Sequence, residues 1–143
     1  AERGGLDDGR VELLAEWLLA RAASGAFAPA WRETPARALV HGHCHEKAFG
    51  VFDAVLDALR LAPGLEVAAI ESSCCGMAGA FGYEAEHREV SQAMAEASLL
   101  PAVREADDAT LVVADGTSCR HQIADGAGRE ARHLARVLAE RVG

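Results

Sequence analysis

The chain has 143 residues and a formal net charge of −8, with Lys47 as its only lysine. This length can bury a hydrophobic core without disulfide staples, and the acidic balance argues against nucleic-acid binding, because neutralising phosphates supplies most of that affinity. No apolar stretch approaches the roughly 20 residues of a membrane-spanning helix, and the amino end lacks a signal-peptide pattern. We therefore expect no nucleic-acid partner, no membrane span and a cytoplasmic location, with any membrane association made through partners.

The first part of the chain predicts a helix, a loop and a strand. Asp7 and Asp8 can cap a helix with an apolar stripe, and Gly25 is a natural stop. A short apolar strand follows at residues 36–40 and leads into a histidine-rich segment. The polar leader that begins at Ala1 also suggests a piece of a longer polypeptide.

The rest of the chain alternates helices and strands. Its predicted elements, in order, are a helix at 47–60, a strand at 65–70, one long or two shorter helices at 84–106 with a restart at Pro101, a strand at 110–114, a short helical turn after Cys119 and a final helix at 129–141. This alternation is typical of an α/β domain with a short parallel sheet of about three or more strands flanked by helices. We predict one globular unit in which residues 36–143 form the cysteine-rich α/β domain. Residues 1–35 then supply a leader, an additional amino-terminal helix and a loop.

The four cysteines follow the three predicted strands. They are Cys44 after the first strand, Cys74 and Cys75 after the second, and Cys119 after the third. Because the carboxyl ends of parallel strands share one edge of the sheet, we expect these thiols to converge where α/β folds place ligands. Adjacent cysteines rarely form a disulfide, and in a reducing compartment the four thiols are expected to be ligands or reactive groups.

The adjacent cysteines suit a metal or a redox reaction. Residues 72–82 read SSCCGMAGAFG, and we expect Cys75 to lie at a helix amino terminus, where the helix dipole lowers the pKa of a thiol. Gly76 and Gly79 let the backbone approach a bulky inorganic cluster or a substrate. Since thiolates favour zinc, iron and iron–sulfur clusters, the sequence predicts a metal-binding site here.

Histidines accompany two of the cysteines and extend the candidate site. The candidate ligands are His43, His45 and His121. In an extended segment His41 shares the face of His43 and His45, and we rank it behind them. His43 is also a candidate base for Cys75 as a nucleophile, and Arg120 is a candidate for holding a carboxylate, since its guanidinium fork matches that group.

Three motifs together resemble the cysteine-rich CCG domain. They are HCH at residues 43–45, CCGMAGAFGYE at residues 74–84 and SCRHQIADG at residues 118–126. This domain occurs in heterodisulfide reductase, in the glycolate oxidase iron–sulfur subunit and at the carboxyl end of fused FAD/iron–sulfur oxidoreductases. The extended loop and the Cys-Arg-His-Gln ending are most similar to the last group, which oxidises D-2-hydroxy acids such as D-lactate and 2-hydroxyglutarate. The resemblance spans about residues 37–141.

The resemblance implies a set of metal ligands, and this chain departs from the family pattern at one of them. The implied ligands are Cys44, Cys74, Cys75 and Cys119. The family pattern ends in Cys-x-x-Cys, but Gln122 stands where the second cysteine of that motif belongs. This leaves open an iron–sulfur cluster completed by His121 or His43, or a mononuclear iron or zinc site.

The resemblance also implies that hydride leaves the 2-hydroxy acid at an FAD bound elsewhere in a longer parent protein, because this chain has no dinucleotide-binding fingerprint. We expect the domain to relay electrons from the flavin or to complete its substrate pocket. Its expected partners are FAD-binding and ferredoxin-like domains or subunits of a D-lactate, glycolate or D-2-hydroxyglutarate dehydrogenase, and it is not expected to be catalytic alone. Two alternatives are a thiol/disulfide redox enzyme using Cys75 and a non-catalytic scaffold that docks other subunits.

Overall fold

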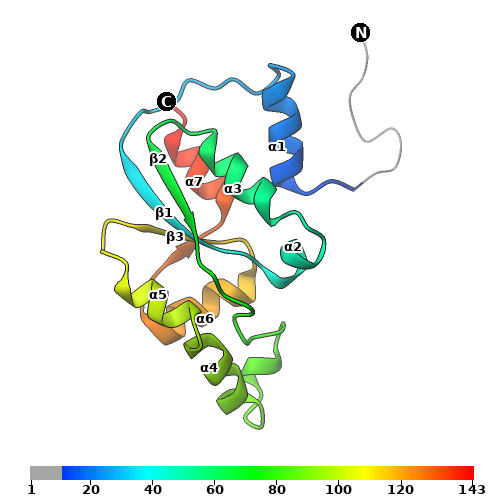
Figure 1. Cartoon of the computed structure of the whole chain (residues 1–143), viewed down its shortest axis with the longest axis vertical. Coiled ribbons are helices and arrows are strands. Elements are labelled where there is room, and N and C mark those ends of the chain that lie inside the picture. The colour runs from blue at the N-terminus through cyan, green and yellow to red at the C-terminus, as the bar shows by residue number, and fades with distance from the viewer. Residues whose placement is uncertain (1–10) are drawn as a thin grey trace.

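A computed structural model describes residues 11–143, and a parallel sheet lies at its centre (Figure 1). The strands are β1 (Ala36–His41), β2 (Leu65–Ala69), β3 (Leu111–Ala114) and β4 (Ala131–Arg132), in the order β2-β1-β3-β4. Each pair is parallel, and Val40 of β1 lies opposite Ala69 on one side and Val113 on the other. The predicted α/β class and its three predicted strands are confirmed, and β4 is an additional short strand.

Helices surround this sheet and include the expected amino-terminal helix. They are α1 (Leu14–Ala23), α2 (Cys44–Ala48), α3 (Phe52–Arg60), α4 (Arg88–Glu96), α5 (Leu99–Glu105), α6 (Thr117–Ala127) and α7 (Leu134–Arg141), with a 3₁₀ turn η1 (Phe81–Tyr83) before α4. Asp7 and Asp8, the predicted caps of the first helix, lie outside the described residues.

Two hydrophobic clusters cover the two faces of the sheet. One contains Leu18 of α1 and Leu59 of α3, together with side chains of α7. The other contains Ile123 of α6 together with side chains of α5. Side chains alternate along a strand, so Val112 and Val113 of β3 enter opposite clusters. The sheet is therefore covered on both faces, which explains the near-continuous apolar sequence of β3.

The strand order reverses between β1 and β3. After β1 the chain continues to α3 on one face of the sheet, whereas after β3 it continues to α6 on the other face. Connections that diverge in this way open a crevice at the carboxyl ends of the strands, where α/β proteins bind ligands. The segments that follow β1 and β3 therefore mark the place where a site is expected.

The predicted helix at residues 47–60 is wrong in detail, because it forms the two helices α2 and α3. Gly50 adopts φ +69° between them, a left-handed conformation that suits glycine. The predicted segment at residues 84–106 forms α4 and α5, as its second alternative states. Pro101 is the third residue of α5, where a missing N–H breaks no intrahelical hydrogen bond.

The carboxyl-terminal helices also differ from their predictions. The short turn predicted after Cys119 is the eleven-residue helix α6, which is capped by Gly128 at φ +64°. The final helix starts at Leu134 rather than at Arg129, because residues 131–132 pair with β3 as strand β4. A two-residue strand has too little sequence pattern to be predicted.

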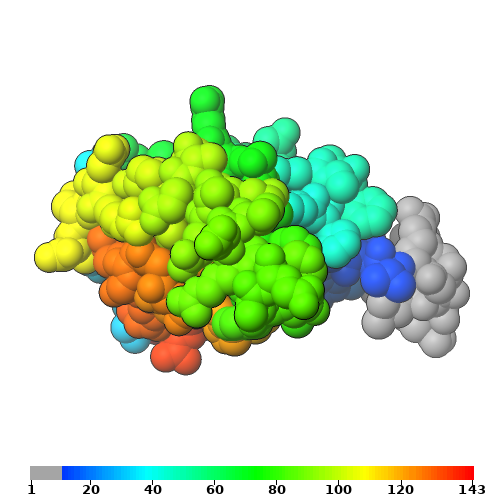
Figure 2. All heavy atoms as spheres, turned by 90° about the horizontal axis from the view of Figure 1, so that it is seen from below, coloured from blue at the N-terminus to red at the C-terminus, as the bar shows by residue number. Residues whose placement is uncertain are grey.

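The molecule is elongated, with α4 and η1 at one end and α1 toward the other (Figures 1 and 2). Within residues 11–143, no helix combines the length and apolarity needed to cross a bilayer.

The amino-terminal helix packs on the rest of the fold, because Ala15 and Leu18 of α1 share a hydrophobic cluster with Val55 of α3. The division of the chain at residue 35 stays a prediction.

Candidate metal centre

The topology brings the four cysteines to one edge of the sheet as free thiols. Cys44 is the first residue of α2, directly beyond β1, and Cys119 lies in the first turn of α6, beyond β3. Cys74 and Cys75 lie in the loop beyond β2. The thiols form two hydrogen-bonded pairs, Cys75 with Cys119 and Cys44 with Cys74. Their role as metal ligands stays a prediction that this geometry permits.

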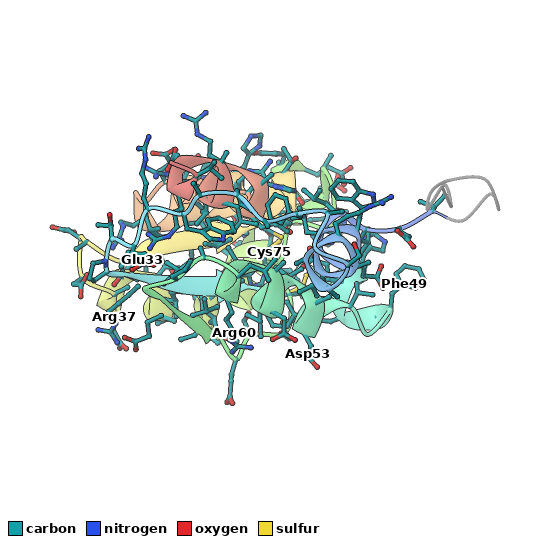
Figure 3. The ribbon with its side chains drawn as sticks, turned by 90° about the horizontal axis from the view of Figure 1, so that it is seen from above. Glu33, Arg37, Phe49, Asp53, Arg60 and Cys75 are labelled. Carbon is teal, nitrogen blue, oxygen red and sulfur yellow. The ribbon has the colours of Figure 1, made fainter. Side chains whose placement is uncertain are left out.

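The more deeply buried thiol pair, Cys75 and Cys119, lies next to His41, the histidine that the sequence ranked last. One ligand atom each from His41, Cys75 and Cys119 lie within 4.8 Å of one another. These residues are 1%, 2% and 0% exposed, respectively. In Figure 3 Cys75 lies near the middle of the view, whereas Phe49 projects outward from the region of α2. The three donors therefore form a compact, buried centre.

The two ring nitrogens of His41 have different surroundings. Nδ1 is hydrogen-bonded to the Ser72 hydroxyl at 2.7 Å. Nε2 is buried and, by distance and angle, has no hydrogen-bond partner among residues 11–143. Leaving a buried polar atom unpaired costs on the order of 1–3 kcal/mol, so such an atom calls for a physical explanation.

The pKa values of Cys75 and Cys119 shift in opposite directions. The hydrogen bond from Cys119, with help from His41 and from the Met77 N–H, holds the pKa of Cys75 at about 4 against the opposing effect of burial. The same hydrogen bond and burial raise the pKa of Cys119 well above its ordinary value. Near neutral pH, Cys75 is therefore a thiolate that accepts a hydrogen bond from the Cys119 thiol.

The second thiol pair is less buried. Burial and a hydrogen bond with Cys74 raise the pKa of Cys44 to about 11. The Gly76 N–H donates to Cys74 Sγ at 3.3 Å. Lys47 Nζ donates to the Ser72 carbonyl and approaches that of Ser73 at 3.4 Å, which ties α2 to the loop that carries Cys74.

The expectation that Cys75 begins a helix is wrong. The chain continues beyond it as a loop to η1, and the thiol at a helix amino terminus is Cys119 instead. Gly76 has φ +85°, and a Cβ there would lie 2.1 Å from the Ser91 carbonyl oxygen, so this glycine permits tight packing against α4. Gly79 has φ +72° with open space around it. A cofactor contact of either glycine stays a prediction.

His43 lies beside the buried centre, and His45 lies at its outer side. A Cβ at Gly116 would be 2.3 Å from His43 Cδ2 and 2.9 Å from Cys119 Sγ, so the imidazole and the thiol flank this glycine. Burial, followed by repulsion from His45, lowers the pKa of His43. His43 Nδ1 accepts from the backbone N–H of the exposed His45 at 3.3 Å. His43 is thus the nearer of the two predicted ligands.

The remaining predicted residues on α6 have other contacts. His121 is exposed, and its Nδ1 is hydrogen-bonded to the Tyr83 hydroxyl at 3.1 Å. Arg120 donates to the carbonyls of Ala114 at 3.0 Å and Asp115 at 2.6 Å, which fixes the junction of β3 and α6. A role for Arg120 in holding a carboxylate, or for His121 in ligation, stays a prediction.

Gln122, which stands where the CCG pattern that the sequence resembles has its last cysteine, is part of the scaffold around the centre. Its side-chain amide donates to the Cys75 carbonyl at 2.9 Å and to the Ser91 hydroxyl at 3.1 Å. The side chain is 7% exposed. It therefore holds the Cys75 loop against α4.

A cavity of about 440 Å³ lies next to the centre, at the crevice between β1 and β3. Its polar walls include His43, Glu46, Asp115 and His133, and its apolar walls come from the start of α1 and from Phe49. The Glu46 carboxylate accepts from the His43 N–H at 2.8 Å, and it also hydrogen-bonds with Asp115. His43 thus lies both at this cavity and beside Cys119.

Sequence reasoning missed the position of His41 and the partner that holds it. In β1, Ala38 and Val40 belong to one hydrophobic cluster, whereas Leu39 packs against the other, which contains both Cys75 and Cys119. Extending the strand by one residue would have placed His41 on the face of Leu39. The alternation of β1 was therefore a usable signal. Ser72 carries no comparable signal.

The fold and the buried donors define a cysteine-rich α/β domain with a candidate metal centre. Over 136 residues the chain is 34% identical to one subunit of anaerobic glycerol-3-phosphate dehydrogenase from Escherichia coli strain K12, and equally to the same subunit from Escherichia coli O157:H7. The match covers 95% of this chain and 33% of the relative, so the chain spans about a third of the length of the curated relatives it matches. No family model matches the chain, and no solved structure matches it.

Proposed function

We propose that this chain is the metal- or iron–sulfur-binding domain of an FAD-linked oxidoreductase and that it relays electrons away from the flavin. The observation that carries this proposal is the buried convergence of His41, Cys75 and Cys119, with a second thiol pair beside them. The similarity to a dehydrogenase subunit over 95% of the chain supports an oxidoreductase setting. The resemblance to the CCG domain supports the same assignment.

The donor set fits the proposed group. Sulfur donors with an imidazole nearby suit iron, zinc and iron–sulfur clusters. The lowered pKa of Cys75 favours its thiolate, which is the form that binds a metal cation. The residues that would hold the group are Cys44, Cys74, Cys75 and Cys119, with His43, His45 and His121 as the histidines proposed from sequence. When bound, an iron or iron–sulfur group supplies one-electron transfer.

The protein around the centre excludes water and fixes the thiols. Cys75 and Cys119 are buried, the loop that carries Cys75 packs on Ser91, and the Gln122 side chain holds that loop by donating to the Cys75 carbonyl. Lys47 bonds the loop segment ahead of Cys74, and its positive charge offsets a small part of the rise that burial and Cys74 cause in the pKa of Cys44. A rigid, dry site of this kind limits reorganisation when an electron arrives or leaves.

The proposed substrate is a small anionic alcohol oxidised elsewhere in the parent protein. The resemblance favours a 2-hydroxy acid such as D-lactate, glycolate or 2-hydroxyglutarate. The relatives are named for glycerol 3-phosphate, which is also an anionic alcohol. In either case oxidation of the C–OH group would release a hydride and a proton, for which an FAD in a partner domain would be the hydride acceptor and a basic group of that domain the proton acceptor. FAD-binding and ferredoxin-like domains or subunits are the proposed partners.

The first test is the metal content of the chain purified without oxygen, with iron, zinc and acid-labile sulfide measured beside an ultraviolet–visible spectrum. We expect bound metal in the wild type, loss of metal in Cys75→Ala and no loss in the adjacent control Ser73→Ala, whose side chain is exposed. The parent oxidoreductase is then assayed with D-lactate, 2-hydroxyglutarate, glycolate and glycerol 3-phosphate. Neither iron nor zinc in the protein, together with unchanged parent activity in Cys75→Ala, would falsify the proposal.

A second candidate function is thiol/disulfide exchange at Cys75, and its low pKa favours this alternative. Its 2% exposure opposes it, because a disulfide substrate cannot reach this sulfur without movement of the loop. Iodoacetamide treatment of metal-free protein separates the two functions. Rapid alkylation of one cysteine together with turnover of a small disulfide would support the exchange enzyme, whereas slow alkylation would support the metal centre.

A further inference from the structure

His41 has a buried nitrogen whose polar neighbours within residues 11–143 are cysteine sulfurs. The residue is 1% exposed, and by distance and angle Nε2 makes no hydrogen bond to the described residues, although His41 lies close enough to Cys75 to lower its pKa. An imidazole placed so deeply normally pairs both of its ring nitrogens, because an unpaired one loses its hydration without compensation. The sulfurs of Cys75 and Cys119 lie beside this nitrogen, and an ion held between the three atoms would accept the nitrogen lone pair.

The surroundings of this nitrogen are those of a metal ligand. A ligand atom of His41 lies within 4.8 Å of the sulfurs of Cys75 and Cys119, close enough for one ion to contact all three. Since Nδ1 is engaged by Ser72, the nitrogen available to such an ion is Nε2. A soft metal bound by two thiolates and one imidazole is a common combination in proteins.

Ser72 completes the arrangement by fixing the ring. With Nδ1 protonated, the imidazole donates to the Ser72 hydroxyl, and the lone pair of Nε2 is free. Metal-binding histidines usually donate their second nitrogen in this way. Ser72 is itself held, because its N–H donates to the Ile70 carbonyl at 2.9 Å and its own carbonyl accepts from Lys47.

The other three histidines near the cysteines are less suited to this position. His45 and His121 are exposed, and His121 bonds Tyr83. His43 lies close to Cys119, but its ring lines the neighbouring cavity. It is therefore the proper competitor for any test of His41.

We propose that His41 Nε2 is a direct ligand of the metal or iron–sulfur group held by Cys75 and Cys119, and that Ser72 is the positioning residue that orients the ring. This inference rests on the proposed metal-binding function and names a ligand outside the set that the sequence suggested. A neutral imidazole in place of a thiolate makes an iron centre less negative and raises its reduction potential. The centre is then chemically distinct from one held by thiolates alone.

The test uses the full chain, freed of metal and titrated with Co²⁺ alone without oxygen. We expect thiolate-to-cobalt absorption and one exchangeable, hyperfine-shifted proton resonance from Nδ1–H of His41. In His41→Leu the resonance disappears or Co²⁺ binding is lost, whereas both survive in the control His87→Leu, which lies at the start of α4 and outside the candidate centre. His43→Leu tests the competing ligand. Ser72→Ala is expected to weaken Co²⁺ binding by roughly 10–100-fold.

The outcomes separate the two proposals. If the wild type binds neither Co²⁺ nor iron, the metal-binding function itself fails. If Co²⁺ binds through thiolates and the shifted resonance is absent, persists in His41→Leu or vanishes only in His43→Leu, the function stands and the His41 assignment is overturned. Should His41→Leu not fold, Ser72→Ala decides, because unchanged Co²⁺ affinity and unchanged exchange of the shifted proton would also overturn the assignment.

Discussion

Glu46 illustrates how single residues near the centre respond to burial. Its side chain caps α2 by accepting from the His43 N–H, yet the residue is 8% exposed and hydrogen-bonds with Asp115. Burial raises the pKa of this carboxyl to about 7, with a further contribution from Asp115 and against the capping N–H. The folded protein therefore favours the protonated form of Glu46.

This raised pKa predicts a decline in stability with rising pH. The folded pKa of about 7 exceeds the ordinary value of 4.5, so the contribution of Glu46 is fully present below pH 4.5 and is lost as the pH rises to about 7. The loss is on the order of 2 kcal/mol in the free energy of unfolding. Urea denaturation of metal-free protein across this range should show a smaller decline in Glu46→Gln than in the wild type. Glu86→Gln, at an exposed position, should follow the wild type; equal slopes for Glu46→Gln would contradict the prediction.

At the scale of single residues, the sequence could predict that the four thiols converge but not how they pair. Each cysteine follows an apolar run that is readable as a strand, so their common edge is a consequence of parallel topology. The sequence could not show that Cys75 pairs with Cys119 and Cys44 with Cys74, because loop geometry decides that pairing. It also ranked His43 and His45 ahead of His41, since the last residue of a strand is hard to place from periodicity.

The loop between β2 and α4 is the element that shapes the centre, and its two left-handed glycines have different tasks. At Gly76 both φ and the Ser91 carbonyl oppose a side chain, whereas at Gly79 only φ does. The sequence could show that glycines punctuate this loop. It could not show which of them packs against a helix.

Gly76→Ala and Gly79→Ala form a matched pair of substitutions. For Gly79→Ala we expect a loss of about 1 kcal/mol in the free energy of unfolding, the ordinary cost of a left-handed alanine. For Gly76→Ala we expect at least about 3 kcal/mol or failure to fold, because the new Cβ would lie 2.1 Å from the Ser91 carbonyl oxygen and force backbone to move. Chemical denaturation measures both. A Gly76→Ala variant as stable as Gly79→Ala would show that the loop does not pack on α4 in solution.

Arg141 of helix α7 connects this helix to two other parts of the fold. This side chain is 7% exposed and donates to the carbonyls of Thr34 and Pro63, the latter at 3.0 Å. It therefore joins the end of α7 to the segments that enter β1 and β2. Nothing in the helical periodicity distinguishes this buried arginine from the exposed Arg136 on the same helix.

Arg141→Met should destabilise the fold by about 1–2 kcal/mol, because it removes the charged donor of two partly buried hydrogen bonds, to the carbonyls of Thr34 and Pro63. Arg136→Met removes an exposed ion pair with Glu140 and should change the free energy of unfolding by no more than about 0.5 kcal/mol. Thermal and urea denaturation of both variants check this contrast. Equal effects would mean that Arg141 is solvated in solution.

At the scale of the whole molecule, the domain places its candidate metal centre beside a cavity, with His43 between them. This arrangement follows from the reversal of strand order between β1 and β3 and was predictable from the α/β pattern as a common edge. The cavity itself depends on how α1 and α2 pack, which periodicity does not specify. The domain could serve the parent oxidoreductase in two ways that kinetics can distinguish. An electron relay acts after the flavin is reduced, whereas a substrate pocket acts before.

Rapid kinetics of the parent oxidoreductase with Cys119→Ala should separate these roles. If the domain relays electrons, substrate mixed with the variant should bleach the flavin at the wild-type rate, while steady-state transfer to a one-electron dye falls by at least about 100-fold, since the centre can no longer hold its metal. Phe49→Ala, at the cavity wall but 76% exposed, is the control for a local disturbance and should leave both steps near wild type. Slow bleaching in Cys119→Ala would instead indicate that the domain completes the substrate pocket. That outcome would contradict the proposed electron relay, and it would assign the cavity beside the centre to substrate binding.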